Sequence, residues 1–307
     1  MTIPFDLPPK YLHDVRIFNL PSTVTNNQWH TWNKPLGISM VNILCIGGGG
    51  GGGGGFTAAA AAARGGGGGG GSSAVARVII PAHAIPNTLY IQVGAGGIGV
   101  GSGGGTAGSG VNSYVCVFPN TTANNVLVIA NNSGTLPAGG GTGTGVAVGA
   151  AGTAGGIAAI AGMPLAGMGQ FALIAGQIGI AGGAVAGAIG PPQAFPTTGV
   201  ITMGGPGGAG TTSADFAGGI ITAVANTMLS QDMPIGPAAG SFDGSGGYLH
   251  PQLLFSYCGL GGSASNAGIG GQGGIGGPGS GGGGGGGGTT GGRGGDGGAG
   301  IVMITAW

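Results

Sequence analysis

Residues 42–55 read Asn-Ile-Leu-Cys-Ile followed by nine consecutive glycines, Gly47 to Gly55. Two further uninterrupted runs, Gly65 to Gly71 and Gly281 to Gly288, contain seven and eight glycines. Glycine supplies 85 of the 307 residues, against a usual share of about 7%. Such a composition indicates collagen, a low-complexity linker or another repetitive architecture.

The arrangement of the glycines and the overall composition exclude the first two classes. Collagen requires a strict Gly-X-Y repeat with abundant proline, whereas the longest runs here are pure glycine. Disordered chains combine low hydrophobicity with high net charge, but 41% of these residues are apolar and the formal charge is zero. The glycine runs therefore belong to an ordered fold.

A chain without Cβ atoms can form the extended helix of the polyproline II family, which rises about 3.1 Å per residue, and such helices can pack side by side. Runs of seven to nine glycines then span about 22 to 28 Å, a similar length that allows stacking in register. Ordering glycine costs more than one hydrogen bond returns. We therefore predict a cooperative polyglycine II sandwich, anchored at its ends by an apolar framework.

A three-residue period marks the outer edges of this sandwich. Ile269, Gln272, Ile275 and Pro278 recur at every third position, and Arg293, Asp296 and Ala299 follow the same spacing. Because the helix has three residues per turn, each set lies along one edge. We expect these side chains to face outward.

Short segments rich in β-branched and aromatic residues flank the glycine runs, which is typical of strands. They predict a mainly β and irregular fold in which a small sheet anchors the glycine helices. The first and last strands are expected to be neighbours. The predicted strands are 39–46, 74–80, 88–93, 114–118, 126–130 and 301–307.

The charged residues exclude several functions. Only twelve residues are charged, and none lies between 78 and 214, so counterion release cannot drive nucleic-acid binding. Cys45, Cys116 and Cys258 have no CxxC spacing, so we interpret them as small buried apolar residues. The four histidines are scattered, and GxGxxG matches are expected by chance in so much glycine. We therefore expect no enzyme activity, no metal and no cofactor. The start of the chain lacks a signal-peptide pattern, which favours assembly in the cytoplasm.

Two regions lie outside the glycine pattern. Residues 1–28 contain prolines and several charges, and we interpret them as an N-terminal docking arm or as an ordinary terminus lying on its own domain. The remaining domain, 29–307, contains inserted loops at about 191–258. Aromatic residues in these loops either contact a receptor or form a small hydrophobic core. The receptor-contact candidates are Phe195, Phe216, Phe242, Tyr248 and Phe255.

Several stretches together carry a family resemblance. They are Trp32-Asn-Lys-Pro-Leu-Gly37, Val41-Asn-Ile-Leu-Cys-Ile46 before polyglycine, Val93-Gly-Ala-Gly-Gly97 and the ending 294–307. In this order, they resemble the glycine-rich domain of tailed-bacteriophage fibre and virion proteins. Related adhesins carry polyglycine II sandwiches whose distal loops contact the host. This sequence departs from them at 139–190, where alanine, isoleucine and valine replace polyglycine.

The resemblance implies a virion surface protein, assembled in the host cytoplasm. Host attachment on a tail fibre or fibre tip is the first expectation, and a capsid decoration or head fibre is the alternative. The expected partners are other virion proteins, copies of the same chain and a host receptor. The uncharged stretch 157–189 exceeds the length of a membrane span, which raises a third function, membrane penetration. Its glycine, alanine, Pro164 and two glutamines argue against insertion.

Overall fold

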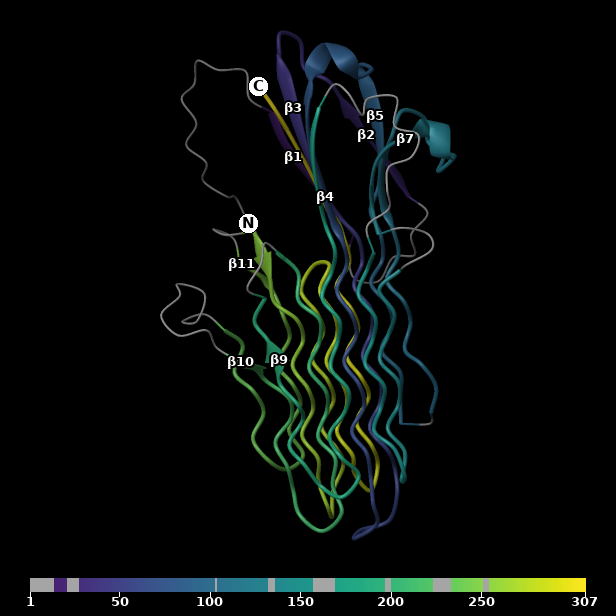
Figure 1. Ribbon diagram of the computed structural model, residues 1–307, viewed down its shortest axis with the longest axis vertical. Coiled ribbons are helices and arrows are strands. Elements are labelled where there is room, and N and C mark those ends of the chain that lie inside the picture. The colour runs from purple at the N-terminus through teal and green to yellow at the C-terminus, as the bar shows by residue number, and fades with distance from the viewer. Residues whose placement is uncertain are drawn as a thin grey trace.

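A β-framework and a bundle of extended glycine-rich segments make up the molecule (Figure 1). The computed structural model describes residues 14–20, 28–102, 104–131, 136–156, 169–196, 200–222, 233–250 and 254–307. These residues are mainly β-strand and irregular. Within the described ranges the helical elements are two short 3-10 turns, η1 (Ala82–Ala84) and η2 (Ala123–Asn125). No helix in this part of the chain is long and apolar enough to cross a membrane, and 157–168 lie outside it.

The larger sheet has five antiparallel strands in the order β1-β13-β3-β4-β8. Strands β3 and β13 pair from Ile46 with Ile301 to Val41 with Ala306, which confirms that the first and last predicted strands are neighbours. The strands are β1 (Asp14–Asn19), β3 (Met40–Ile46), β4 (Val75–Pro81), β8 (Gln170–Ile174) and β13 (Ile301–Ala306).

The second sheet has the order β2-β5-β6-β7, formed by β2 (Trp29–Asn33), β5 (Thr88–Gln92), β6 (Ser113–Cys116) and β7 (Val126–Ala130). Alternate residues of both sheets, including Ile43 and Ile91, share one buried core. The prediction of a single sheet was wrong. The six predicted strands divide between two sheets because each sheet has one apolar face, and facing sheets bury both.

A second, smaller core lies where the bundle meets two short strand pairs. Strand β9 (Gln193–Ala194) pairs with β10 (Ile221–Thr222), and β11 (Leu249–His250) pairs with β12 (Phe255–Ser256). The buried members of this core are Met203, Ile221, Phe255, Tyr257, Cys258 and Leu260.

The glycine bundle consists of extended segments, several of which continue directly from framework strands (Figure 1). Segment 47–55 leaves β3, 65–73 returns into β4, and 290–300 enters β13. The register of the sheets therefore fixes where these segments start. The other segments are 94–101, 104–112, 136–143, 146–156, 175–184, 188–192, 201–211, 216–220, 242–248, 257–265, 268–279 and 280–288.

Segment 47–55 makes hydrogen bonds with six neighbouring segments, and each partner recurs at every third residue. Its N–H groups donate to 104–112, 290–300 and 65–73. Its carbonyls accept from 94–101, 136–143 and 280–288. Donor pairs include Gly48 to Val111 (2.9 Å), Gly51 to Gly108 (3.0 Å), Gly49 to Gly298 (2.9 Å), Gly52 to Gly295 (2.7 Å), Gly50 to Gly71 (2.8 Å) and Gly53 to Gly68 (2.7 Å).

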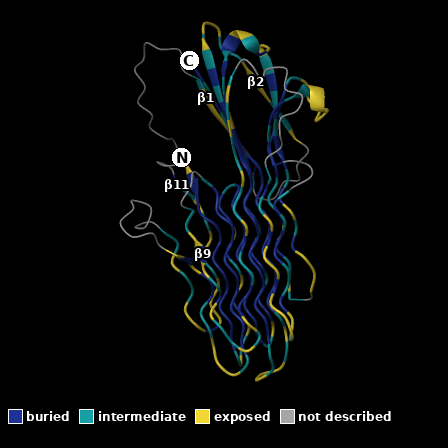
Figure 2. Ribbon diagram, in the orientation of Figure 1, coloured by how far each residue is buried: buried dark blue, intermediate teal, exposed yellow. Residues whose placement is uncertain are grey.

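The three uninterrupted glycine runs lie in mutually neighbouring segments at the centre of the bundle. The glycine run 65–71 and segment 280–288 each also make hydrogen bonds with six segments, including each other. A Cβ on Gly67 would lie 2.0 Å from the carbonyl oxygen of Gly53, and one on Gly52 would lie 2.0 Å from that of Gly283. Full enclosure is the reason these positions are glycine, and Figure 2 shows buried backbone throughout the interior.

At the edges of the bundle, side chains point outward where a segment reaches the surface. Ile269, Gln272 and Ile275 are exposed, whereas Gly270 and Gly274 between them are buried. Arg293, Asp296 and Ala299 are half-buried, and the glycines between them are buried. The predicted outward period of three is confirmed.

Residues 14–19 of the predicted arm 1–28 form edge strand β1, while 1–13 and 21–27 lie outside the described residues. The docking role of the arm stays a prediction. Much of the predicted loop region 191–258 runs within the bundle, since 201–211 and 216–220 hydrogen-bond to other segments. The sequence did not predict these bundle segments, because side chains interrupt their glycines; in 201–211, Met203, Pro206 and Ala209 occupy every third position.

Candidate functional site

The distal end of the bundle is the set of turns farthest from the sheets (Figure 1). It includes turns 56–64, 143–146, 211–216, 265–268 and 288–290. Many of these turn residues are exposed (Figure 2). Because the turns belong to consecutive hairpins of the bundle, sequence-distant residues are brought together here.

Arg64 ties three distal turns together. Its side chain is fully buried. Nε donates to Ala62 (3.1 Å), Nη1 to the carbonyls of Ser265 (3.2 Å) and Asn266 (3.0 Å), and Nη2 to Thr212 (3.3 Å) and to Asn266 Oδ1 (2.9 Å). Burial lowers the pKa of the Arg64 guanidinium and Asp215 opposes that shift, but a guanidinium stays charged in proteins.

Asn266 extends this network to the surface. Its N–H donates to Asp215 Oδ1 (2.7 Å), its Nδ2 donates to the Ser213 carbonyl (3.2 Å), and its Oδ1 also accepts the Ala61 N–H (3.0 Å). Ala61 has a positive φ of 62°, a conformation that such a hydrogen bond helps to hold. The distal turns are thus fixed by the bonds of the buried Arg64 side chain and by exposed bonds of Asn266, which sequence reasoning missed. The lone arginine after six alanines was the available signal.

Three of the receptor-contact candidates lie at the second core: Phe255 belongs to it, Phe195 packs against it, and Tyr248 packs against its member Tyr257. Phe195 stacks on Phe255 with ring centroids 4.9 Å apart, and Tyr248 packs against Tyr257 at 5.0 Å. Phe255 is buried, Phe195 is half-buried, and Tyr248 is 37% exposed. Phe255 contacts the rings of both Phe195 and Tyr257, so its role is packing. Tyr248 has the largest exposed fraction of the three candidates in this group.

The other two candidates lie apart from that core. Phe216 is half-buried, and its backbone pairs with Ala264. Phe242 is 57% exposed, the most of the five, and its N–H donates to Ser263 Oγ (2.8 Å). Phe242 and Tyr248 occupy opposite ends of segment 242–248, about 19 Å apart at the rise of an extended helix.

A family model described as a glycine-rich domain matches residues 23–307. The chain belongs to this glycine-rich domain family. The match runs from just before β2 to the C-terminus, so it includes most of the framework and the whole bundle. A search of the curated proteins found no match.

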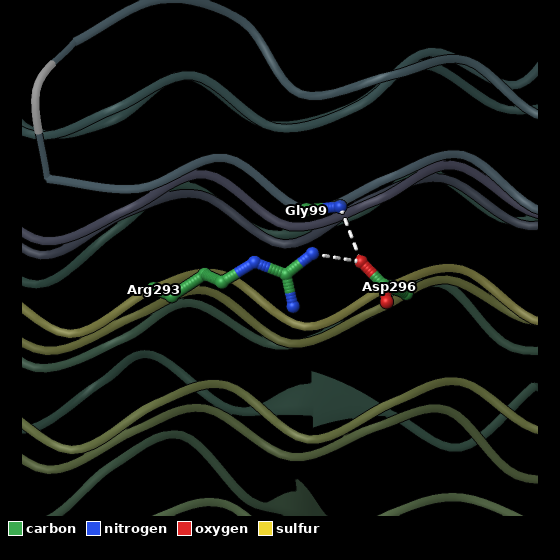
Figure 3. A network of polar contacts seen from close by, with 3 residues as sticks. All are labelled: Gly99, Arg293 and Asp296. Atoms are coloured by element: carbon green, nitrogen blue, oxygen red, sulfur yellow. Dashed lines mark hydrogen bonds and ion pairs between the residues drawn. The ribbon is translucent and has the colours of Figure 1, made fainter.

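Aspartates complete the hydrogen bonding of this glycine-rich domain at its edges. Asp296 Oδ1 accepts the Gly99 N–H (2.7 Å) and a bond from Arg293 (Figure 3). Asp243 Oδ1 accepts the Gln272 N–H (2.7 Å). These N–H groups lie where no further segment supplies a carbonyl, so a carboxylate takes its place. The sequence predicted only that Arg293 and Asp296 lie along one outward-facing edge.

The three cysteines of the domain are enclosed. Cys45, Cys116 and Cys258 are free and buried, which confirms their interpretation as buried apolar residues. Burial raises the pKa of each thiol, to about 12 for Cys116 and Cys258, so they stay protonated and unreactive near neutral pH. In the described part of the chain, no three His, Cys, Asp or Glu side chains are grouped to hold a metal ion.

Proposed function

We propose that this glycine-rich domain is a non-enzymatic structural protein of a bacteriophage virion. It is exposed at the surface as part of a tail fibre or fibre tip, where it attaches the particle to its host. Its bundle is a polyglycine II sandwich, and its partners are other virion proteins, copies of itself and a host receptor.

The hydrogen-bond pattern supports the polyglycine II assignment. Segment 47–55 has six neighbours: three accept hydrogen bonds from its N–H groups, three donate to its carbonyls, and each recurs at every third residue. This pattern fits a hexagonal array of helices with three residues per turn. A Cβ added to Gly52 or Gly67 would lie 2.0 Å from a carbonyl oxygen of the neighbouring segment. The backbones are therefore too close together for side chains, as expected for packed helices of glycine.

The observation that carries the attachment proposal is the fixed distal end. A bundle rooted in a β-sandwich at one end presents turns at the other (Figure 1), and the buried Arg64 network holds those turns in place. Preordered turns bind at a lower entropic cost than mobile ones. Phe242 and Tyr248 add exposed aromatic surface along the adjoining edge, and aromatic rings supply much of the binding energy in interfaces.

Adsorption of particles carrying single substitutions tests this role. Phe242→Ala and Tyr248→Ala should each lower the equilibrium constant for reversible adsorption by about tenfold, since an aromatic contact contributes on the order of 1.4 kcal/mol or more. Phe118→Ala is the matched control, because Phe118 is 60% exposed but belongs to the framework. Normal adsorption by both bundle variants, with intact particles, would reject attachment through this edge.

A capsid decoration is the second candidate, and the uncharged sides of the bundle favour it because they suit tiling against neighbours. Densitometry of purified particles separates the two locations. A few copies per virion support the tail, whereas hundreds of copies support the shell.

A further inference from the structure

One side of the bundle is an apolar surface that we name the alanine face. It is formed by the segments 146–156, 175–184 and 188–192. Hydrogen bonds from Gly179 to Gly152 (2.9 Å) and from Gly182 to Gly149 (3.0 Å) join the first two segments. The exposed residues that define the face are Val148, Ala151, Ala175, Ile178, Ala184 and Ile189.

Inward and outward positions alternate on this face with a period of three. A Cβ on Gly176, Gly179 or Gly182 would lie 2.1, 2.1 or 1.9 Å from a backbone oxygen of segment 65–73. The intervening positions Ala175, Ile178 and Ala184 are exposed. Their methyl groups occupy the space that another hydrogen-bonded segment would need, so the bundle cannot continue by adding a glycine segment here. A partner must instead pack against the side chains.

The alanine face has no charge. No Asp, Glu, Lys or Arg occurs anywhere between residues 78 and 214, and Ile178 and Ile189 are 58% and 60% exposed. A surface that carried net charge would repel a copy of itself, and this one does not. Exposed apolar patches of this kind mark protein-contact surfaces.

The size of the face matches a weak, concentration-dependent interface. Its three segments have eleven, ten and five residues, so they span about 34, 31 and 16 Å as extended helices, and at roughly 4.8 Å of width for each chain they cover about 390 Å². Two apposed faces would bury roughly 800 Å² in total, below the roughly 1,200 Å² of standard interfaces.

We propose that the alanine face is covered by the same face of a second copy of this chain, related by a two-fold axis. The outward side chains recur about every 9 Å along each segment, because the extended helix has three residues per turn. The same face of a second copy has the same spacing, so the outward methyl groups of one copy fit above the inward glycines of the other. A two-fold pair of identical patches is the commonest form of oligomer. This inference specifies the self-association part of the proposed function, and it leaves Phe242 and Tyr248 on other segments.

Sedimentation velocity of the full chain over a range of concentrations tests the proposal. The unmodified chain should form a dimer. Ile178→Asp should raise the dimer dissociation constant about a hundredfold or more, because it buries an unpaired charge in the interface. Ile269→Asp is the matched control: Ile269 is 61% exposed and lies on segment 268–279, which has no hydrogen bond to the alanine face.

Circular dichroism should show that both variants stay folded, because both side chains are exposed in the monomer. A monomeric unmodified chain overturns the proposal. An Ile178→Asp dimer as stable as the unmodified one, or a control that dissociates equally, also overturns it. The adsorption assay does not depend on Ile178, so failure of the dimer and failure of host attachment can be told apart.

Discussion

Replacing Gly67 with alanine places a methyl group between two of the central glycine runs. The new Cβ would lie 2.0 Å from the Gly53 carbonyl oxygen and 2.5 Å from its carbon. Contacts shorter than about 3.0 Å are excluded, so the backbones must separate by about 1 Å. No flexible side chain is present to absorb this movement.

The cost follows from the hydrogen bonds at that point. Separation breaks the bonds from Gly53 to Gly68 (2.7 Å), from Gly67 to Gly285 (2.8 Å) and from Gly285 to Gly53 (2.8 Å). Three bonds at about 1 kcal/mol each, with about 1 to 3 kcal/mol of overpacking, outweigh the gain of up to about 1 kcal/mol from a stiffer unfolded chain. We expect a net loss of about 3 to 5 kcal/mol in the free energy of unfolding, a large part of the roughly 5 to 15 kcal/mol of a typical domain.

Gly246→Ala is the matched control. A Cβ at Gly246 meets only the Ile275 carbonyl oxygen at 3.7 Å, an ordinary contact, so this variant should be neutral or more stable by up to about 1 kcal/mol. Urea unfolding followed by circular dichroism gives both values. Equal stability of Gly67→Ala and Gly246→Ala would refute the close-packed interior.

Three further predictions concern buried polar groups. Arg64→Lys should destabilise the protein by about 2 to 4 kcal/mol in urea unfolding, because an ammonium group cannot replace the hydrogen bonds of a buried guanidinium. The side chain of Arg293 is 41% exposed, so the control Arg293→Lys should change stability by less than about 1 kcal/mol. Equal effects of the two substitutions would contradict the role of Arg64. Asn131→Ala should lower the free energy of unfolding by about 2 to 3 kcal/mol. The Asn131 Oδ1 accepts the Ala74 N–H (2.6 Å), its Nδ2 donates to the Gly48 carbonyl (3.2 Å), and its backbone φ is 63°. An unchanged urea unfolding midpoint would contradict this prediction. The pKa of the Cys116 and Cys258 thiols rises from 9.0 to about 12 on folding, so no thiol should react with a disulfide reagent at pH 8 until the protein is denatured. Because the folded pKa is the higher one, their contribution to stability is fully present below pH 9 and is lost between about pH 9 and 12, which urea midpoints across that range would check.

The framework was largely predictable because its strands obey local rules. The segments predicted at 39–46, 74–80 and 126–130 coincide with β3, β4 and β7 within one or two residues. Alternation and β-branched residues identify such strands without tertiary information. Strand β1 was missed because charged and exposed residues interrupt its pattern, and its stability comes from pairing with β13.

The bundle was predictable where glycine is pure and not where side chains intervene. Segment 201–211 carries Met203, Pro206 and Ala209, all buried, yet its carbonyls accept from Gly281, Gly284 and Gly287. Met203 fits because it belongs to the second core, and Pro206 fits because it lies over Gly219, where a Cβ would approach the Pro206 Cβ to 2.9 Å. Both are properties of tertiary packing that no local pattern contains.

The distal site was the least predictable feature. Arg64 and Asn266 are more than 200 residues apart in sequence, and their bond depends on how the hairpins are stacked. The aromatic candidates were recognisable as residue types, but whether each ring is buried like Phe255 or exposed like Phe242 depends on where the segments meet.

Hydrogen exchange of the central amides tests most directly whether the glycine runs are the ordered fold. The amides of 47–55, 65–71 and 281–288 should exchange only through global or near-global unfolding, with protection factors of about 10,000 or more for a domain of ordinary stability. Exchange at the rate of an unstructured peptide, while framework strands β3 and β13 remain protected, would show that the runs are flexible linkers and would contradict the account.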